Sequence, residues 1–369
     1  MMNRASIALS CASLLTCIVS AQNPARKPAL PVGSLTAGRD MTTARGGHTA
    51  NILPDFKVFI AGGEDQRGNV LASTEIYDPT TETFTRAARM TVPREGHAAG
   101  ALSDGKILIA GGATHGDVAL ASSEDYDPET GKFTPRGAMH AARIRPAVTV
   151  LRDGRILVTG GTNGKSVLDS GETYDVLNGK WTLTGRMTTA RSGHTATLLS
   201  DGRVLLTGGV DSKHSVLASA EIFDPQTNKF SAISPLHEGR LMHTAVLLPS
   251  GKVLIAGGAS DPAGQNPISS AELYDPESHL FSSAGKMNEP RMKMPDQAAL
   301  LDGRALIVGG AASAEIFNPR DGSFRAVSGT LDAARFYSAA IQLMDGSTRI
   351  FGGYDAQGSS TAKTWIYRP

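Results

Sequence analysis

The stretch REGHAAGALSDGKILIAGG, residues 94–112, decides the fold of this 369-residue chain. It returns in recognisable form as RSGHTATLLSDGRVLLTGG at residues 191–209. The paired glycines that end it recur 43 to 52 residues apart, at 62–63, 111–112, 160–161, 208–209, 257–258, 309–310 and 352–353. A spacing of about 50 residues indicates an array of repeated units, each of which needs its neighbours to bury a core.

Other features keep the same spacing. A Met or Leu precedes an Arg by four residues in every unit, and these arginines are Arg45, Arg94, Arg143, Arg191, Arg240, Arg291 and Arg335. Six units carry a Glu two residues before an aromatic, and then a second aromatic: Glu75/Tyr77/Phe84, Glu124/Tyr126/Phe133, Glu172/Tyr174/Trp181, Glu221/Phe223/Phe230, Glu272/Tyr274/Phe281 and Glu315/Phe317/Phe324. Seven such coincidences establish a repeat protein.

Each unit divides into four short strands. In the second unit we expect them at 96–102, 106–110, 121–126 and 132–136, joined by tight turns such as Asp104-Gly105. The second strand is apolar without alternation, which is typical of a strand buried on both faces. The glycine pair that follows it suits a place where two backbones approach closely or φ is positive.

From Leu35 to the C-terminus, the ordered glycine pair, aromatic and second aromatic resemble the kelch repeat of the galactose oxidase central-domain superfamily, in its secreted bacterial-type form. The resemblance implies an all-β fold, a β-propeller with four antiparallel strands per blade. Seven units then predict a seven-bladed propeller.

The two ends of the chain complete one another. The last unit stops at Trp365–Pro369, where other units continue into a fourth strand. Leu35-Thr36 lies six residues before Met41, just as Phe84-Thr85 lies six residues before Met90. We therefore expect the N-terminal strand to close the last blade and remove the free sheet edges of an open ring.

Residues 1–21 are predicted to be a secretory signal peptide. They combine a basic start at Arg4, a short apolar run over residues 5–20 and small residues up to Ala21. The apolar run is shorter than the roughly 20 residues of a bilayer span, so a retained anchor is a weaker alternative. Lipidation at Cys17 is another, although Thr16 fits it poorly. Residues 22–33 are predicted to be a flexible proline-rich lead-in, residues 34–369 the propeller, and the location secreted or periplasmic.

Charge and cysteine content exclude several functions. Without Arg4 the chain has 35 basic and 35 acidic residues, so it lacks the positive field that attracts nucleic acids or anionic membranes. We expect no nucleic-acid partner, no membrane span and a monomer. Both cysteines, Cys11 and Cys17, fall in the predicted leader. The mature chain would then have no disulfide, thiolate metal site or Tyr–Cys copper cofactor, and we expect no cofactor.

The two faces of the predicted propeller differ in variety. Turns between first and second strands repeat one pattern, such as Ser103-Asp104-Gly105 and Ser200-Asp201-Gly202, whereas the loops after the glycine pairs differ in length and chemistry. Since loops on a rigid scaffold commonly carry binding groups, we expect a ligand on the loop face. The predicted ligand-binding residues are Arg67, His115, Asp117, Lys165, Asp211, Lys213, His214, Gln265, Tyr354 and Asp355.

The recurring arginines and histidines each allow two interpretations. A ring of arginines could attract anionic ligands, but recurrence in all units favours a structural partner, either the recurring Glu or backbone carbonyls. Four units carry a His three residues after the Arg: His48, His97, His194 and His243. These could line the channel and bind a metal. No local ligand spacing supports that, so no metal site is predicted.

Three functions are compatible with the sequence. We favour a non-catalytic binding module for a protein or glycan, and a protein slightly more because Tyr354 is the only aromatic of the variable loops. The alternative is a carbohydrate-active enzyme such as a sialic-acid mutarotase-like epimerase, whose acid, base and anion-binding groups would come from Arg145, Glu95, Glu238, Glu289 and Asp332. The third is a structural role in the cell envelope. No residue is predicted to be catalytic.

Overall fold

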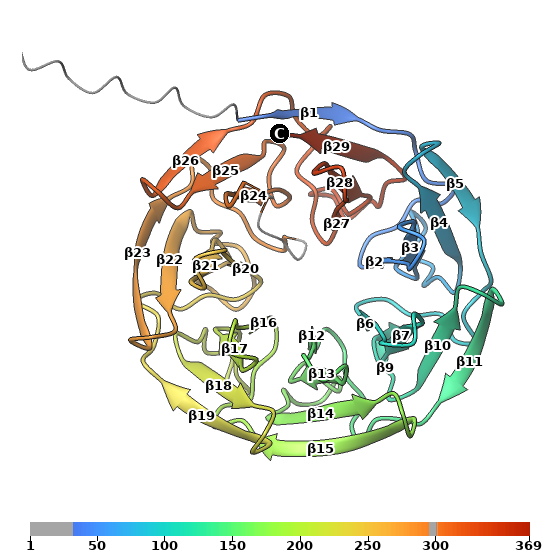
Figure 1. The fold of residues 1–369 in the computed structure, drawn as a ribbon, viewed down its shortest axis with the longest axis horizontal. Helices are drawn as coiled ribbons and strands as arrows, with labels where there is room; N and C mark the ends of the chain where they lie inside the picture. The colour runs from blue at the N-terminus through green and yellow to red at the C-terminus, as the bar shows by residue number, and fades with distance from the viewer. Residues whose placement is uncertain (1–31, 295–299, 301) are drawn as a thin grey trace, which may run out of the picture. The chain divides into compact units, whose positions relative to one another are not determined.

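In the computed structural model, residues 32–294, 300 and 302–369 are described. Val32–Pro369 form one compact unit. Figure 1 shows its blades arranged in a ring around a central axis. The predicted leader and all but the end of the lead-in lie outside the described residues.

The described residues form six four-stranded antiparallel sheets, one three-stranded sheet and a two-stranded hairpin. The innermost strands are β2 (Thr49–Ile52), β6 (Ala98–Ala101), β12 (Ala147–Val150), β16 (Thr195–Leu198), β20 (Thr244–Leu247) and β27 (Ala339–Gln342). The second strands are β3 (Val58–Ala61), β7 (Ile107–Ala110), β13 (Ile156–Thr159), β17 (Val204–Thr207), β21 (Val253–Ala256), β24 (Ala305–Ile307) and β28 (Thr348–Phe351). The three-stranded sheet belongs to blade six, and residues 295–299 and 301 precede its β24.

The outer half of each blade follows the same order. The third strands are β4 (Thr74–Asp78), β10 (Ser123–Asp127), β14 (Ser170–Asp175), β18 (Ala220–Asp224), β22 (Ser270–Asp275), β25 (Glu315–Asn318) and β29 (Thr364–Arg368). The outermost strands are β5 (Thr83–Arg86), β11 (Lys132–Arg136), β15 (Lys180–Arg186), β19 (Lys229–Ile233), β23 (Leu280–Lys286), β26 (Ser323–Ala326) and β1 (Ser34–Ala37). The four strands predicted for the second unit are confirmed within one residue at each end, except that the innermost and the third begin two residues later than predicted.

The first strand of the chain closes the ring, as the sequence predicts. β1 pairs antiparallel with β29 over Ser34↔Arg368 to Ala37↔Trp365. The Leu35 amide also donates a hydrogen bond to the Ser328 carbonyl of blade six, at 2.8 Å. The last blade is therefore assembled from both ends of the propeller.

The core consists of seven apolar clusters, one between each pair of neighbouring blades. The second strands supply the largest share of it, because their side chains are buried on both faces. The recurring aromatics pair across the third and fourth strands, as Tyr126 and Phe133 do with ring centroids 5.2 Å apart. Phe59 of the preceding blade stacks on Tyr126 at 4.2 Å, which locks one blade against the next.

The glycine pairs meet both requirements expected of them. Gly112 has a φ of 88°, a left-handed conformation that side chains disfavour. A Cβ there would lie 2.6 Å from the carbonyl oxygen of Glu95 in the adjacent strand connection. These glycines let the loop after the second strand turn beside the connection that enters the blade.

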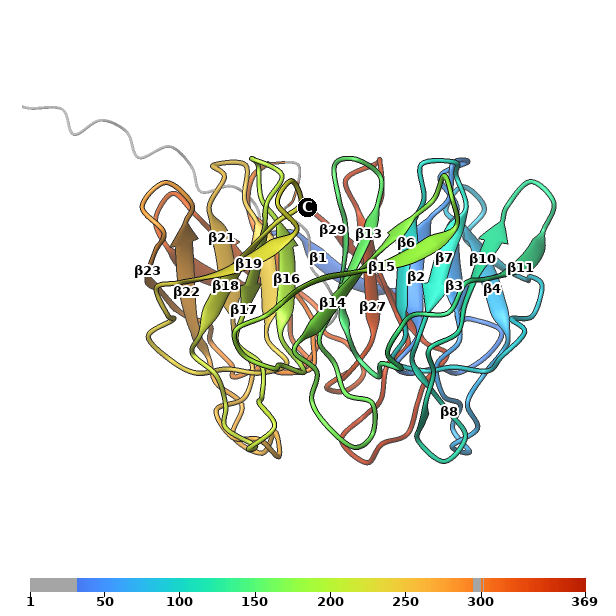
Figure 2. The same ribbon diagram turned by 90° about the horizontal axis from the view of Figure 1, so that it is seen from below.

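Turns and loops separate to opposite faces of the ring. Figure 2 shows the loop that contains β8 projecting from the side opposite the tight turns. That loop carries a small hairpin of β8 (Ala113–Thr114) and β9 (Val118–Ala119). We call this side the loop face and the other the turn face. No helix in the described part of the chain is long and apolar enough to span a bilayer.

Candidate functional site at the channel mouth

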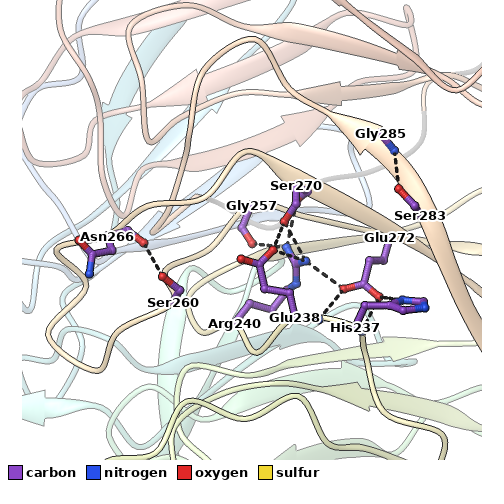
Figure 3. Close-up of polar contacts among 10 residues, drawn as sticks. All are labelled: His237, Glu238, Arg240, Gly257, Ser260, Asn266, Ser270, Glu272, Ser283 and Gly285. Atoms are coloured by element: carbon purple, nitrogen blue, oxygen red, sulfur yellow. Dashed lines mark hydrogen bonds and ion pairs between the residues drawn. The ribbon is translucent and has the colours of Figure 1, made fainter.

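The recurring arginines are buried and form ion pairs and hydrogen bonds within the blades. In six blades the guanidinium donates to the Glu of the third strand, at 2.7 to 3.1 Å. It also donates to two backbone carbonyls, such as those of Gly257 and Ser270 for Arg240 (Figure 3). The structural interpretation of these arginines is therefore confirmed.

In blade seven the recurring arginine pairs with a different carboxylate. Trp365 occupies the position of the recurring Glu, and Arg335 pairs instead with Asp332 at 2.7 Å. The Arg335 guanidinium also lies 5.9 Å from the centroid of Trp365. Asp332, a candidate for the enzymatic alternative, is thus already paired with Arg335 and with Lys363.

Three of the four recurring histidines hydrogen-bond to threonine in the preceding blade. Nε2 lies 2.8 Å from Thr49 Oγ1 for His97, and 2.9 Å from Thr195 Oγ1 for His243. His194 uses Thr159 instead, at 2.9 Å. Burial lowers the pKa of His97 to about 3, so its imidazole stays neutral. The described residues contain no group of three His, Cys, Asp or Glu side chains able to hold a metal ion.

His48 differs from the other three. Its side chain is 6% exposed, and neither ring nitrogen has a hydrogen-bond partner among the described residues. The reason lies in the neighbouring blade, where Ala339 and Phe351 occupy the places of the threonines. His48 therefore sits in the wall of the channel with unmet hydrogen-bonding capacity.

The predicted ligand-binding residues lie on the loop face. Arg67, His115, Asp117, Lys165, Lys213, His214 and Gln265 are exposed there, and Asp211, Tyr354 and Asp355 are partly buried. Asp211 and Asp355 stabilise their own loops, because Oδ1 of each accepts backbone N–H groups two and four residues later, at 2.8 to 3.0 Å. Asp65 does the same in blade one.

Tyr354 points to a different place. Its hydroxyl lies 3.1 Å from both Glu95 Oε2 and the Gly46 carbonyl. Burial, followed by the negative charge of Glu95, raises the pKa of Tyr354. Its ring also packs edge-on against Tyr337, with centroids 6.4 Å apart. Tyr354 thus belongs to the mouth of the central channel.

A ring of backbone hydrogen bonds surrounds this mouth. It involves the residue two positions after each recurring Arg, and we call these seven residues the collar: Gly47, Gly96, Arg145, Gly193, Met242, Lys293 and Tyr337. Six of the seven amides donate a hydrogen bond to the carbonyl of the collar residue in the preceding blade, at 2.7 to 3.0 Å. The exception is the Gly193 amide, for which no bond to Arg145 is found. All seven have positive φ, from 48° to 66°.

The collar side chains converge on Tyr337. The Arg145 guanidinium stacks over the Tyr337 ring at 4.6 Å, and the Lys293 ammonium lies 5.8 Å from the same ring. The Tyr337 hydroxyl donates to Met242 Sδ at 3.4 Å. Burial raises the pKa of Tyr337. Burial, and then the charge of Arg145, lower the pKa of Lys293.

Two carboxylates stand beside these cations. Glu95 lies next to Gly47 in the collar and binds Tyr354. Burial, and then the charge of Glu95, raise the pKa of Glu64. Below the collar a cavity of about 770 Å³ runs into the channel between the innermost strands, a volume in the range of small-molecule sites. The mouth thus combines cations, acids and aromatics around an open space.

Sequence reasoning found part of this cluster. Arg145 and Glu95, considered for the enzymatic alternative, lie at the mouth, whereas Glu238 hydrogen-bonds with Ser270 beside Arg240 (Figure 3). Glu289 is exposed, and its amide donates to Glu315 at 3.3 Å. Met242, Lys293 and Tyr337 were missed. The signal available was the collar position itself, which is Gly in three repeats and a large side chain in four.

Comparison with known proteins agrees with the repeat and the fold. The kelch motif model matches residues 46–91, 143–188 and 190–237. Over 49 residues the chain is 41% identical to beta-scruin of Limulus polyphemus, a match that covers 13% of this chain and 5% of that protein. A solved structure of a fungal alcohol oxidase of the AA5 family, in complex with copper, superposes with a TM-score of 0.75.

That superposition covers 92% of this chain and 76% of the oxidase chain at 18% sequence identity, so it supports the fold alone. The kelch matches fall on separate repeats of a closed ring with seven blades. The chain is a seven-bladed β-propeller that contains kelch motifs.

Proposed function

We propose that this chain is an exported, non-catalytic binding module that holds a protein or glycan ligand on its loop face. The observation that carries the proposal is where the repeats differ: the turn face repeats itself, whereas the loop face changes from blade to blade. A rigid ring that presents varied loops is a common way to build a binding surface. The leader-like residues 1–21 support export.

A protein ligand is favoured over a glycan. Sugar-binding surfaces commonly use exposed aromatic rings as platforms. Tyr354 is the only aromatic of the variable loops, and its hydroxyl is directed to Glu95 and the Gly46 carbonyl. The exposed part of the loops instead offers charged and amide groups such as Arg67, Lys165 and Gln265, which suit the polar rim of a protein interface.

The test compares the two faces. A photo-crosslinking amino acid is placed at His115 or Lys165 on the loop face, and at Leu177 or Met344, which are 94% and 77% exposed in turns of the opposite face. We expect a protein to be captured from the loop-face positions alone. The purified partner is then titrated against a variant with Ala at Arg67, His115, Lys165 and His214.

That variant should bind the partner at least about tenfold more weakly, since interface charges of this kind contribute roughly 1.4 kcal/mol or more together. The matched control replaces Lys57, Lys106 and Lys252 on the turn face and should bind as the unmodified protein does. If the loop-face variant keeps full affinity, the loop face is not the binding surface.

A second candidate function is a sugar epimerase of the sialic-acid mutarotase type. The observation in its favour is that a cation, Arg145, lines the cavity, while a carboxylate hydrogen-bonded to a tyrosine, Glu95 with Tyr354, lies beside Gly47 of the same lining. These groups could bind a sugar carboxylate and move a proton. NMR exchange measurements of anomer interconversion in sialic acid test it: acceleration that Glu95→Gln abolishes supports the enzyme, and no acceleration refutes it.

A further inference from the structure

We propose that the collar binds a carboxylate group, held by Arg145 and Lys293, from a ligand that also carries hydrogen-bond donors. The proposal deepens the function proposed above, because it names the chemistry recognised at the centre of the same face. The carboxylate can belong to a small hydroxy acid or to an acidic side chain of a peptide, and the experiment below separates these sources.

The first argument is that neither cation at the mouth is held in a direct ion pair, although the charge of Arg145 reaches Glu64 and lowers its pKa. Neither Arg145 nor Lys293 forms an ion pair or a side-chain hydrogen bond within the described residues; both instead contact the Tyr337 ring. The recurring arginines, by contrast, each bind a carboxylate. Two like charges over one aromatic ring oppose each other, which is why Arg145 contributes to the lowered pKa of Lys293. An anion between them would stabilise both.

The second argument comes from the backbone. Collar residues have a left-handed conformation, which glycine adopts readily and other residues adopt at a cost. Three blades use glycine, yet Arg145, Met242, Lys293 and Tyr337 have φ values of 48°, 54°, 54° and 51°. Side chains at strained positions commonly serve a site rather than the fold. Here Arg145, Met242 and Lys293 all contact Tyr337.

The third argument concerns the space that Arg145 occupies. Its side chain extends past Gly96, where a Cβ would lie 3.0 Å from Arg145 Cγ. The guanidinium therefore lies at the opening of the cavity of about 770 Å³. A planar guanidinium matches the two oxygens of a carboxylate, and the Lys293 ammonium adds a charge without directional demands.

The nearby acids define the rest of the ligand. Glu95 and Glu64 would repel a ligand that is anionic throughout. Their oxygens can accept hydrogen bonds from hydroxyl or amide groups placed beside the carboxylate. The mouth therefore favours a carboxylate next to donors over an apolar acid or a polyanion.

Isothermal titration of the purified protein tests the proposal with matched pairs of probes. D-glucuronate is compared with D-glucose, and an acetylated Gly-Glu-Gly amide with its Gly-Gln-Gly counterpart; inorganic phosphate tests for general anion binding. We expect one carboxylate probe to bind while its neutral partner does not. The pair that responds identifies the source as a hydroxy acid or an acidic peptide.

The variants Arg145→Gly and Lys293→Gly restore the glycine found at the collar of other blades, so folding is not at risk. Each should weaken carboxylate binding at least about tenfold. The control Lys132→Ala removes an exposed positive charge from the outermost strand β11 and should change nothing. Circular dichroism confirms that each variant keeps its fold.

The proposal is overturned if neutral and acidic probes bind alike, if phosphate binds as well as the carboxylates, if no carboxylate probe binds at millimolar concentration, or if the glycine variants bind normally. These failures are distinguishable from failure of the loop-face function. If only the carboxylate proposal fails, the variant with Ala at four loop positions still binds the purified partner more weakly, whereas Arg145→Gly binds it normally.

Discussion

Single residues in this propeller divide into those that repeat and those that do not. The buried arginine–glutamate pairs repeat in six blades, with side chains 0 to 5% exposed. Each guanidinium also donates to one carbonyl just after the second strand and one at or just before the start of the third, as Arg191 does to Gly208 and Ser219. These pairs therefore join the entry of a blade to its second and third strands.

Removal of one partner from such a pair should cost far more than removal from a surface pair of the same length. Glu221→Ala leaves Arg191 buried without its carboxylate and should lower the free energy of unfolding by about 3–5 kcal/mol. The control, Asp169→Ala, breaks the Arg186–Asp169 pair, which is also 2.7 Å long but 76% and 38% exposed. It should cost about 1 kcal/mol or less. Guanidinium chloride unfolding measures both, and equal losses would contradict the structural assignment.

At the scale of elements, the seams between innermost strands depend on the histidines. His97 bridges to Thr49 across one seam, whereas His48 finds no partner across the seam between the last and first blades. Blade six has Met294 at the same place, packed near Gly257. The position thus accepts an apolar side chain when no hydrogen bond is available.

The substitution His97→Met should therefore destabilise the protein by about 0.5–1.5 kcal/mol, because it removes a hydrogen bond made in a buried site. His48→Met removes two unsatisfied nitrogens and should leave stability unchanged or raise it. Thermal unfolding of the two variants side by side measures the difference. A loss at His48 as large as that at His97 would show that His48 has a partner in the native protein.

The lowered pKa values of the same histidines predict how the free energy of unfolding depends on pH. Burial lowers the pKa of His97 from 6.5 to about 3 and lowers those of His48, His194 and His243 as well. Between pH 6.5 and 3 the unfolded chain therefore binds more protons at these positions than the folded chain does. The free energy of unfolding should fall as the pH falls through that window.

The measurement is urea unfolding at a series of pH values from 7 to 4. His97→Met removes one of the four groups, so its stability should decline less steeply with acid than that of the unmodified protein. If the two slopes coincide, His97 does not contribute to the acid sensitivity.

For the whole molecule, closure of the ring depends on one short strand. Leu35 of β1 is 4% exposed and packs in the cluster between blades six and seven with Trp365 and Val327. Leu35→Ala should destabilise the protein by about 2–5 kcal/mol. The control, Ile52→Ala on β2, changes a side chain that is 38% exposed and should cost much less. Equal midpoints in denaturant would show that β1 is not needed for closure.

The sequence predicted the ring almost completely. The spacing of the glycine pairs yields seven blades, and the offset of Leu35 from Met41 predicts closure by β1, which its pairing with β29 confirms. Local patterns suffice here because the blades repeat one strand order, and six of the seven repeat the same buried arginine–glutamate pair. The Arg–Glu hypothesis succeeded for the same reason, since a feature present in every repeat has a partner within its own repeat.

The site was less accessible to such reasoning. Arg145 and Tyr337 belong to blades three and seven, and they meet only because the ring brings them to one opening and Gly96 leaves space for the Arg145 side chain. No pattern within one repeat encodes that contact. Tyr354 likewise follows a glycine pair like any loop residue, yet its hydroxyl turns inward to Glu95. Such contacts depend on the curvature of the whole ring.

The collar separates the backbone scaffold of the opening from the side chains that fill it. Amide and carbonyl groups, which every residue type possesses, carry the hydrogen bonds around the mouth. An exchange at one collar position therefore changes the aperture and its charge while the scaffold of the blades stays as it is. A glycine widens the passage, and a long side chain narrows it. Proteins with this architecture could therefore acquire new ligands at the mouth by substitution at the seven collar positions, with the fold of the blades unchanged.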